Sequence, residues 1–103
     1  MEKNTPHYDL ALIKADVRRL GRKAFTKSAE KTGLDLGFSH KEMQEIIFGL
    51  QKRMLYKSMT TYVDHRVWQD VYHINSQDLE IYIKVTYRPA GGPPVISFKE
   101  KNP

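Results

Sequence analysis

The sequence predicts an α+β fold in one domain, residues 1–103, with N-terminal helices packed on one face of a largely antiparallel, twisted β-sheet. Hydrophobic residues in the first half recur at helical spacing, whereas after Arg53 they alternate with a period of two. A chain of 103 residues suits one hydrophobic core. Helices followed by strands at hairpin distances are typical of an antiparallel sheet covered on one side.

The first helix is expected to begin at Thr5 and Pro6 and to end at Gly21. A threonine hydroxyl can cap an unpaired backbone N–H, and proline fits the first turn of a helix. Glycine commonly ends a helix. The apolar positions that predict the buried side are Leu10, Ile13, Val17 and Leu20.

Two further helices are expected before the strands. Residues 22–26 are compatible with a short edge strand, and 26–33 read as two helical turns that the glycine at position 33 stops. Ser39 and Glu42 have the spacing of a capping box and predict the start of the third helix. Its buried side is predicted to be Met43, Ile46, Ile47 and Leu50.

Four strands are expected at about 54–62, 66–74, 79–88 and 95–101, with a turn of glycines and prolines at 89–94. Alternation in the third strand predicts an inward set of Leu79, Ile81, Ile83, Val85 and Tyr87. Its outward set is Glu80, Tyr82, Lys84, Thr86 and Arg88. In the last strand the inward residues are Ile96 and Phe98, and the outward residues are Ser97, Lys99 and Lys101.

The charge is concentrated in one segment. The chain has 17 Lys/Arg and 12 Asp/Glu, a net charge of +5. Residues 14–31 hold seven basic residues against Asp16 and Glu30, which accounts for the whole excess. Clustered positive charge predicts a polyanionic partner, either nucleic acid or an acidic protein, although a solvated helix surface has the same composition.

Several classes of protein are excluded or disfavoured by composition. No apolar run approaches the roughly 18 residues of a membrane span, so no membrane association is expected. The first ten residues lack the apolar core of a signal peptide, which predicts a cytoplasmic protein. The absence of cysteine excludes disulfides, thiolate zinc sites and cysteine nucleophiles.

The outward residues of the last two strands combine aromatic and basic side chains: Tyr82, Lys84, Arg88, Lys99 and Lys101. Cations neutralise phosphates, and aromatic rings stack on bases that are splayed out of a single strand. The pattern is compatible with a binding face for single-stranded RNA, but on its own it fits an ordinary polar sheet surface at least as well.

Three stretches of the chain resemble the MqsR family, the motility quorum-sensing regulator toxins. They are "YKSMTTYVDHRVWQDVY" (56–72), "VISFKEK" (95–101) and "MEKNTPH" (1–7). The resemblance covers nearly the whole chain. It implies a RelE-like fold and an mRNA interferase of a type II toxin–antitoxin system, which is a metal-independent endoribonuclease with a preference for GCU-type sites.

The resemblance also implies the site residues. The family's catalytic lysine, glutamine and tyrosine fall on Lys57, Gln69 and Tyr82. The RNA-binding positions that we predict are His7, Tyr56, Met59, His73, Arg88 and Lys99. Of these, Arg88 comes from the outward set of the third strand, and His73 stands where the family is expected to have an arginine.

The chain departs from the family pattern at two places. With His73 in place of arginine, one phosphate contact is expected to be weaker or pH-dependent. The final hairpin, "YRPAGGPPVISF", is longer than expected and lacks a histidine often found at that turn. No role of that histidine is carried over to this chain.

RNA supplies its own nucleophile, the 2′-OH beside the scissile phosphate. Lysine, with a pKa of about 10.4, is a poor base but suits charge stabilisation of the phosphorane. We favour that role for Lys57 over a base role, which would need desolvation beside Arg88 or Lys99. Tyr82 is expected to donate a proton, Gln69 to orient the substrate, and His7 to be kept neutral by a helix dipole.

The resemblance implies no cofactor and no metal in this chain. The expected partners are mRNA and a cognate MqsA-like antitoxin, with a zinc-binding N-terminal domain and a DNA-binding C-terminal domain. Direct DNA binding is not expected without the antitoxin.

Other functions remain open at this level. Ser58, Asp64 and His65 contain the residue types of a hydrolase triad, but no nucleophile elbow is present. His65 and His73, with Asp64 and Asp70, match no established metal-ligand spacing. Asp64 and His65 fit better as the turn between two strands. A non-catalytic nucleic-acid-binding module and an interaction protein with an acidic partner are the remaining alternatives.

Overall fold

A computed structural model describes residues 1–102, and its elements follow one another in two groups. The first group is β1 (Glu2–Lys3), α1 (Leu10–Leu20), α2 (Lys27–Asp35) and α3 (His40–Phe48). The second is β2 (Leu55–Thr60), β3 (Trp68–Ser76), β4 (Leu79–Val85) and β5 (Val95–Glu100). Within residues 1–102, no helix has the length and apolar character needed to cross a membrane.

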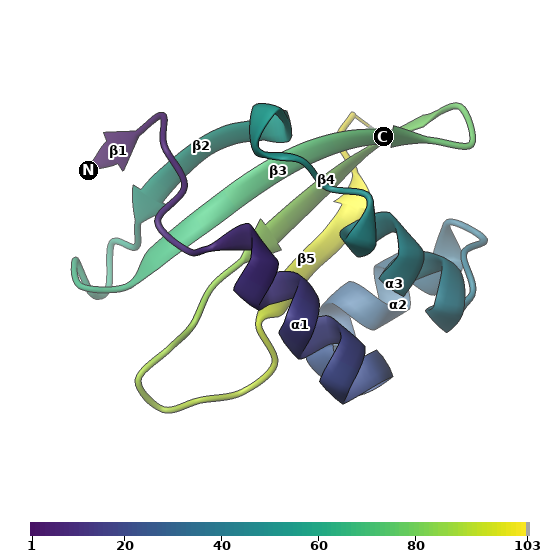
Figure 1. The fold of residues 1–103 in the computed structure, drawn as a ribbon, viewed down its shortest axis with the longest axis horizontal. Coiled ribbons are helices and arrows are strands. Elements are labelled where there is room, and N and C mark those ends of the chain that lie inside the picture. The colour runs from purple at the N-terminus through teal and green to yellow at the C-terminus, as the bar shows by residue number, and fades with distance from the viewer. Residues whose placement is uncertain (103) are drawn as a thin grey trace.

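The strands form one antiparallel sheet in the order β1-β2-β3-β4-β5. The three helices gather on one side of this sheet, and the half that contains β1 and β2 extends past them (Figure 1). The predicted α+β class and the helical covering of one sheet face are therefore confirmed.

The predicted start of α1 at Thr5 and Pro6 is wrong. Asp9 is the N-cap, and its carboxylate accepts a hydrogen bond of 3.0 Å from the N–H of Ala11. The chain first forms β1, which pairs with β2, so Thr5 and Pro6 lie in the connection between β1 and the helix. A two-residue strand shows no alternation, which is why the sequence did not predict β1.

The expectations for α2 also need correction. Residues Gly21–Ala24 form a 3₁₀ turn instead of an edge strand, and only Phe25 makes an isolated bridge, to Val95. Gly33 does not stop the helix, which continues to Asp35. A Cβ at position 33 would overlap the Met43 side chain, so this glycine allows close packing between helices.

The third helix begins as predicted. Ser39 Oγ accepts from the N–H of Glu42 at 3.1 Å, and the Glu42 carboxylate accepts from the N–H of Ser39 at 2.9 Å. Both halves of the capping box are present, which satisfies two backbone donors at this end of α3.

The inward and outward faces of the sheet follow the predicted alternation with two exceptions. Ile96 was expected to face inward, but the register shifts between Lys84 and Val85, so the buried Val95 lies opposite Val85 instead. Thr86 was expected to face outward, but it is buried and donates a hydrogen bond of 2.6 Å to the Trp68 carbonyl. The alternation ends with β4 at Val85, before Thr86.

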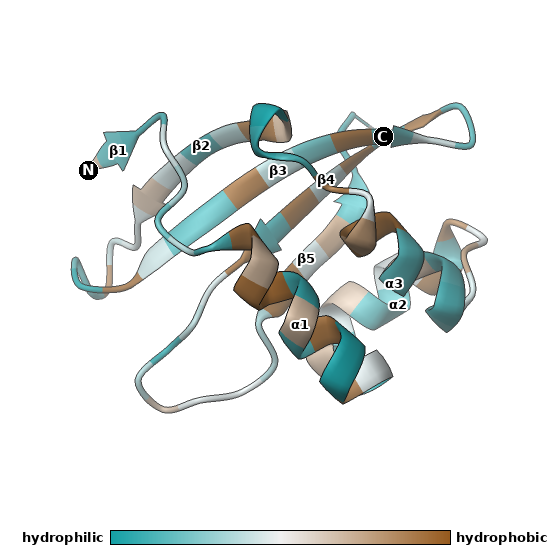
Figure 2. Cartoon of the chain, viewed as in Figure 1, coloured by the Kyte–Doolittle hydropathy of each residue, from teal (hydrophilic) through white to brown (hydrophobic). Residues whose placement is uncertain are grey.

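The core lies between the helices and the sheet, as the hydrophobic segments of α1 and the strands indicate (Figure 2). Phe98 is at its centre, with edge-to-face contacts to Phe25 and Phe38 at centroid distances of 6.1 and 5.9 Å. The residues of 0–1% exposure from the three helices and from β4 are Ile13, Val17, Ala29, Met43, Ile47, Ile81, Ile83 and Val85.

A buried carboxylate fixes the N-terminal segment to the sheet. Asp70 on β3 is fully buried and accepts hydrogen bonds from the backbone N–H groups of His7 and Tyr8, at 3.0 and 2.9 Å. Its other oxygen accepts a bond of 2.6 Å from the hydroxyl of Ser58 on β2. Buried polar groups are costly unless paired, and here each partner satisfies the other.

We expect Asp70→Ala to lower the free energy of unfolding by about 3 kcal/mol, because it leaves three donors without an acceptor. Urea denaturation measures this change. Asp35→Ala is the control, since Asp35 forms only an exposed ion pair with Lys31 and should change stability by less than about 0.5 kcal/mol. Equal unfolding midpoints for the two variants would contradict the structural role of Asp70.

Candidate functional site

One face of the sheet points away from the helices. Ile81 and Ile83 on β4 are buried toward the helices, so the alternating Tyr82 and Lys84 point the opposite way. The pairing register extends this orientation to the neighbouring strands. We call this surface the open face; its residues are Tyr56, Lys57, Met59, Gln69, Val71, His73, Tyr82, Lys84 and Lys99.

The open face brings together the three residues predicted to be catalytic. Lys57 on β2 lies opposite Val71 on β3, and Gln69 is two residues along β3 on the same side. Such diagonal neighbours in an antiparallel pair are about 7–8 Å apart. Tyr82 on β4 lies opposite His73, and Lys57 is close enough for its charge to oppose the rise that burial causes in the pKa of the Tyr82 phenol. The three therefore share one face on adjacent strands, while their roles stay predictions.

Tyr82 lies among cations but is partly buried. The Nζ atoms of Lys99 and Lys84 are 5.1 and 5.8 Å from its ring centroid. Burial raises the pKa of the Tyr82 phenol, against the lowering effect of Lys99 and Lys57. The phenol consequently stays protonated at neutral pH and is able to donate a hydrogen bond or a proton.

Three rings form a row across the open face. Tyr56 stacks on His73 with centroids 4.6 Å apart, and His73 lies 5.8 Å from Tyr82. Tyr56 is 55% exposed, so its outer side is accessible to a nucleobase. Burial and the Lys101 charge lower the pKa of His73, which makes it neutral at pH 7. Unlike an arginine, it offers no fixed charge to a phosphate at that pH.

Lys57 follows a β-bulge in β2, where the register shifts between Leu55 and Lys57. Its Nζ is 3.4 Å from a carboxylate oxygen of Glu2 on β1, and its side chain is 29% exposed. Beside it is a hollow of about 240 Å³, with walls formed by Met1, Glu2, Lys57, Met59, Thr60, Thr61, Tyr62 and His65. The predicted RNA contact Met59 thus lies next to Lys57 and opposite Gln69.

Sequence reasoning missed Glu2 in this region, and it named Lys84 on the outward face without counting it among the site residues. Glu2 is brought to Lys57 by β1, which the sequence did not predict. Lys84 was assigned to the correct face, but alternation does not distinguish it from a solvated lysine. Within residues 1–102 it forms no ion pair or hydrogen bond, and burial together with the Lys57 charge lowers its pKa.

The structure does not bring His7 onto the open face. Its ring stacks on Trp68 at 4.9 Å and an angle of 11°, on the side of β3 that carries Asp70. Burial and the nearby Lys3 lower the pKa of His7, against a raising effect of Asp70. The expected neutral state is therefore supported, but its main cause is desolvation and not a helix dipole.

Arg88 is also apart from the predicted catalytic residues. It follows β4 in the connection to β5, where Nη2 donates a hydrogen bond of 3.0 Å to the Pro93 carbonyl. The basic segment 14–31 falls on α1, the following turn and α2, so it lies on the helix side and does not supply the cations of the open face.

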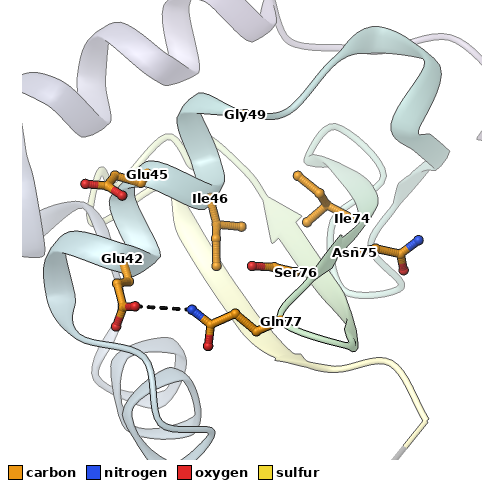
Figure 3. A pocket seen from close by; sticks show the side chains of 8 residues that line it. All are labelled: Glu42, Glu45, Ile46, Gly49, Ile74, Asn75, Ser76 and Gln77. Atoms are coloured by element: carbon orange, nitrogen blue, oxygen red, sulfur yellow. Dashed lines mark hydrogen bonds between the residues drawn. The ribbon is translucent and has the colours of Figure 1, made fainter.

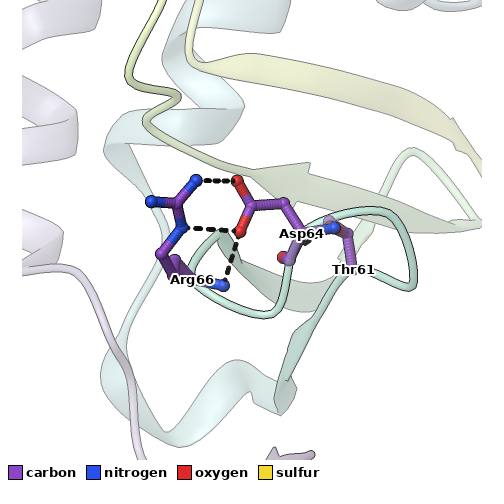
Figure 4. A network of polar contacts seen from close by, with 3 residues as sticks. All are labelled: Thr61, Asp64 and Arg66. Carbon is purple, nitrogen blue, oxygen red and sulfur yellow. Dashed lines mark hydrogen bonds and ion pairs between the residues drawn. The ribbon is translucent and has the colours of Figure 1, made fainter.

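The hydrolase and metal alternatives have no geometric support. Ser58 is buried and bonds to Asp70 instead of a histidine. Asp64 stabilises the β2–β3 turn: it accepts from both the backbone and the guanidinium of Arg66, and its N–H donates to Thr61 Oγ1 (Figure 4). The part of the chain described, residues 1–102, contains no group of three potential metal ligands.

A second hollow, of about 280 Å³, lies between α3 and the β3–β4 hairpin (Figure 3). Glu42 and Glu45 are in its walls, and Gln77 donates a hydrogen bond of 3.2 Å to Glu42. Negative side chains repel phosphates, so this hollow does not suit an RNA backbone. The open face remains the candidate site.

Comparison with known proteins identifies the family. Residues 5–100 match the family described as "Motility quorum-sensing regulator, toxin of MqsA". The mRNA interferase toxin MqsR of Escherichia coli (strain K12) is 41% identical over 101 residues, which cover 98% of this chain and 100% of that protein. The match over nearly the full length of both chains confirms the resemblance seen in the sequence, and the chain belongs to the MqsR family of motility quorum-sensing regulator toxins.

Proposed function

We propose that this chain is an mRNA interferase toxin of a type II toxin–antitoxin system, which cuts mRNA with a preference for GCU-type sites and without a metal ion. The observation that carries the proposal is the shared position of Lys57, Gln69 and Tyr82 on one uncovered face of the sheet. Membership of the MqsR family and the 41% identity to a protein named an mRNA interferase toxin support it.

In the proposed reaction the RNA 2′-oxygen attacks the adjacent phosphorus as the 2′-OH gives its proton to solvent water. The bond between phosphorus and the 5′-oxygen breaks, and that oxygen takes a proton. The charge of Lys57 stabilises the phosphorane, whose extra negative charge develops in the transition state. The protonated phenol of Tyr82 donates to the leaving oxygen, and the neutral amide of Gln69 orients the ribose or phosphate.

The open face also offers groups for binding the flanking nucleotides. The exposed ring of Tyr56, already stacked on His73, provides a surface for one base. Lys99 beside Tyr82 is suited to an adjacent phosphate. His7 and Arg88 lie outside this group of contacts, so a role for them requires RNA that extends beyond the open face.

We also propose that a cognate antitoxin of the MqsA type neutralises the chain. Zinc binding and DNA binding belong to that partner in this proposal, since residues 1–102 present no cluster of metal ligands. The basic residues of α1 and α2 give an acidic partner a surface separate from the open face.

The test is the chemistry of the fragment ends. Purified protein and a defined RNA with a GCU site are expected to give 5′-hydroxyl and 2′,3′-cyclic phosphate ends, with or without EDTA. One 2′-deoxynucleotide at the cleaved position should protect that bond and leave other sites cut. Uncut RNA, cleaved DNA or 5′-phosphate ends would each contradict the proposal.

A further inference from the structure

A second lysine, Lys84 on β4, lies on the open face across β3 from Lys57. The register aligns Lys57 on β2, Val71 on β3 and Lys84 on β4 in one row. Adjacent strands are about 4.8 Å apart, so the two lysine backbones are about 10 Å apart across Val71. Both side chains are long enough to bring their ammonium groups over Val71, within reach of one phosphate.

Val71 is fully buried on the open face, so neighbouring side chains must cover it. Val71 has 0% exposure although it lies on the side away from the helices and outside the core cluster. The aliphatic parts of flanking lysines can cover such a residue while the charged ends reach outward. Lys57 and Lys84 are the residues paired with Val71 on its two sides.

Among residues 1–102, Lys84 has no negative partner to compensate its charge. Within residues 1–102, Lys57 has Glu2, whereas Lys84 forms no ion pair and no hydrogen bond. The half-buried ammonium group faces the charge of Lys57, and both burial and that charge lower the pKa of Lys84. Placing two like charges together disfavours the folded state, and a buried cation without a carboxylate partner is a candidate for binding an anion.

We propose that Lys84 is a fourth residue of the site, and that its ammonium group and that of Lys57 together bind the scissile phosphate of RNA. The inference rests on the proposed function, and it assigns the second cation to the same phosphate. The phosphate supplies the negative charge that the lysine pair lacks, and the pair stabilises the additional charge of the phosphorane. Without substrate, the same pair weakens the folded state.

The competing explanation is that Lys84 only covers Val71. Lys84→Met separates the two, because methionine keeps an unbranched apolar side chain over Val71 and removes the charge. Lys84→Arg keeps the charge. Lys41→Met is the matched control, since Lys41 is an exposed lysine on α3, on the helix side.

In steady-state cleavage of the GCU-containing RNA, Lys84→Met is expected to lower kcat/KM about 100-fold. Lys84→Arg should retain most of the activity, and Lys41→Met should stay within about twofold of the parent. The melting temperature of Lys84→Met should not fall and is expected to rise by about 2–5 °C, because the repulsion with Lys57 is removed. Activity of Lys84→Met within twofold of the parent would overturn the proposal.

A binding measurement tests the lysine pair independently of cleavage. At equal ionic strength, replacing chloride by inorganic phosphate is expected to raise the melting temperature of the parent more than that of Lys84→Met or Lys57→Met. An equal phosphate shift in the parent and in Lys84→Met would overturn the shared site, even if that variant cleaves poorly. If the parent cleaves no RNA but shows the lysine-dependent shift, the proposed function fails while the anion site stands.

Discussion

Lys57→Met is expected to reduce kcat/KM for RNA cleavage by about 1,000-fold, the largest effect of any single substitution on the open face. Lys57 lies between β1 and β3, in the same row as Lys84 and diagonal to Gln69. The strand places its ammonium group on the open face before the substrate arrives, and the Glu2 carboxylate lies 3.4 Å from it. A charge that is already in place stabilises the phosphorane without any cost of reorganising the site.

The measurement is single-turnover cleavage of a GCU-containing RNA, with the melting temperature recorded in parallel. Lys101→Met is the control. Lys101 comes directly after β5 of the same sheet, but its ammonium group forms an ion pair of 3.3 Å with Glu80. The control should lose less than about threefold in activity. If Lys57→Met and Lys101→Met cleave equally well, Lys57 does not stabilise the transition state.

Glu2 limits how strongly Lys57 can bind a phosphate. The carboxylate is 58% exposed and on the edge strand, so its ion pair with Lys57 is weak and easily exchanged for a substrate anion. Lys84 has no such partner among residues 1–102. The two lysines therefore differ: Lys57 has an exposed carboxylate that a substrate anion can replace, and Lys84 depends on the substrate for charge compensation.

The sequence predicted the fold class and the two faces of the sheet because both depend on local periodicity. The alternation around Tyr82 placed Lys84 on the correct side, and the capping box of Ser39 located the start of α3. Each of these signals is contained in one helix or strand and does not depend on which elements pack against it.

The remaining features depend on contacts between elements. The close packing at Gly33 requires Met43 from another helix, and the inward position of Val95 depends on a register shift against β4. Asp9 caps α1 because the residues before it form β1 and the connection from β1 to the helix. None of these is encoded in a short stretch of sequence.

The candidate site was only partly predictable for the same reason. Alternation placed Lys84 on the outward side of the third strand, whereas Lys57 was assigned to the site by the family resemblance. What separates them is the Glu2 carboxylate from β1 and the absence of any such group beside Lys84 within residues 1–102. Resemblance also suggested His7, which the structure places against Trp68 on the other side of β3.

The environment of Tyr82 suits an acid that must keep its proton until the leaving group needs it. Burial raises the pKa of the phenol, while Lys99 and Lys57 limit the rise. Because the pKa stays above its ordinary value of about 10, Tyr82 does not lose its proton at neutral or mildly alkaline pH. In the proposed reaction, the same cations stabilise the phenolate that forms transiently when Tyr82 gives up its proton.

We therefore expect Tyr82→Phe to lower kcat about 100-fold with little change in KM, because phenylalanine keeps the ring beside His73, Lys84 and Lys99 and removes only the hydroxyl that carries the proton. Tyr56→Phe is the control and should stay within about twofold, since stacking needs no hydroxyl. An RNA with sulfur in place of the 5′-oxygen has a leaving group that needs no proton. Tyr82→Phe should cut this RNA nearly as fast as the parent enzyme does, and an equal loss on both substrates would show that Tyr82 does not protonate the leaving group.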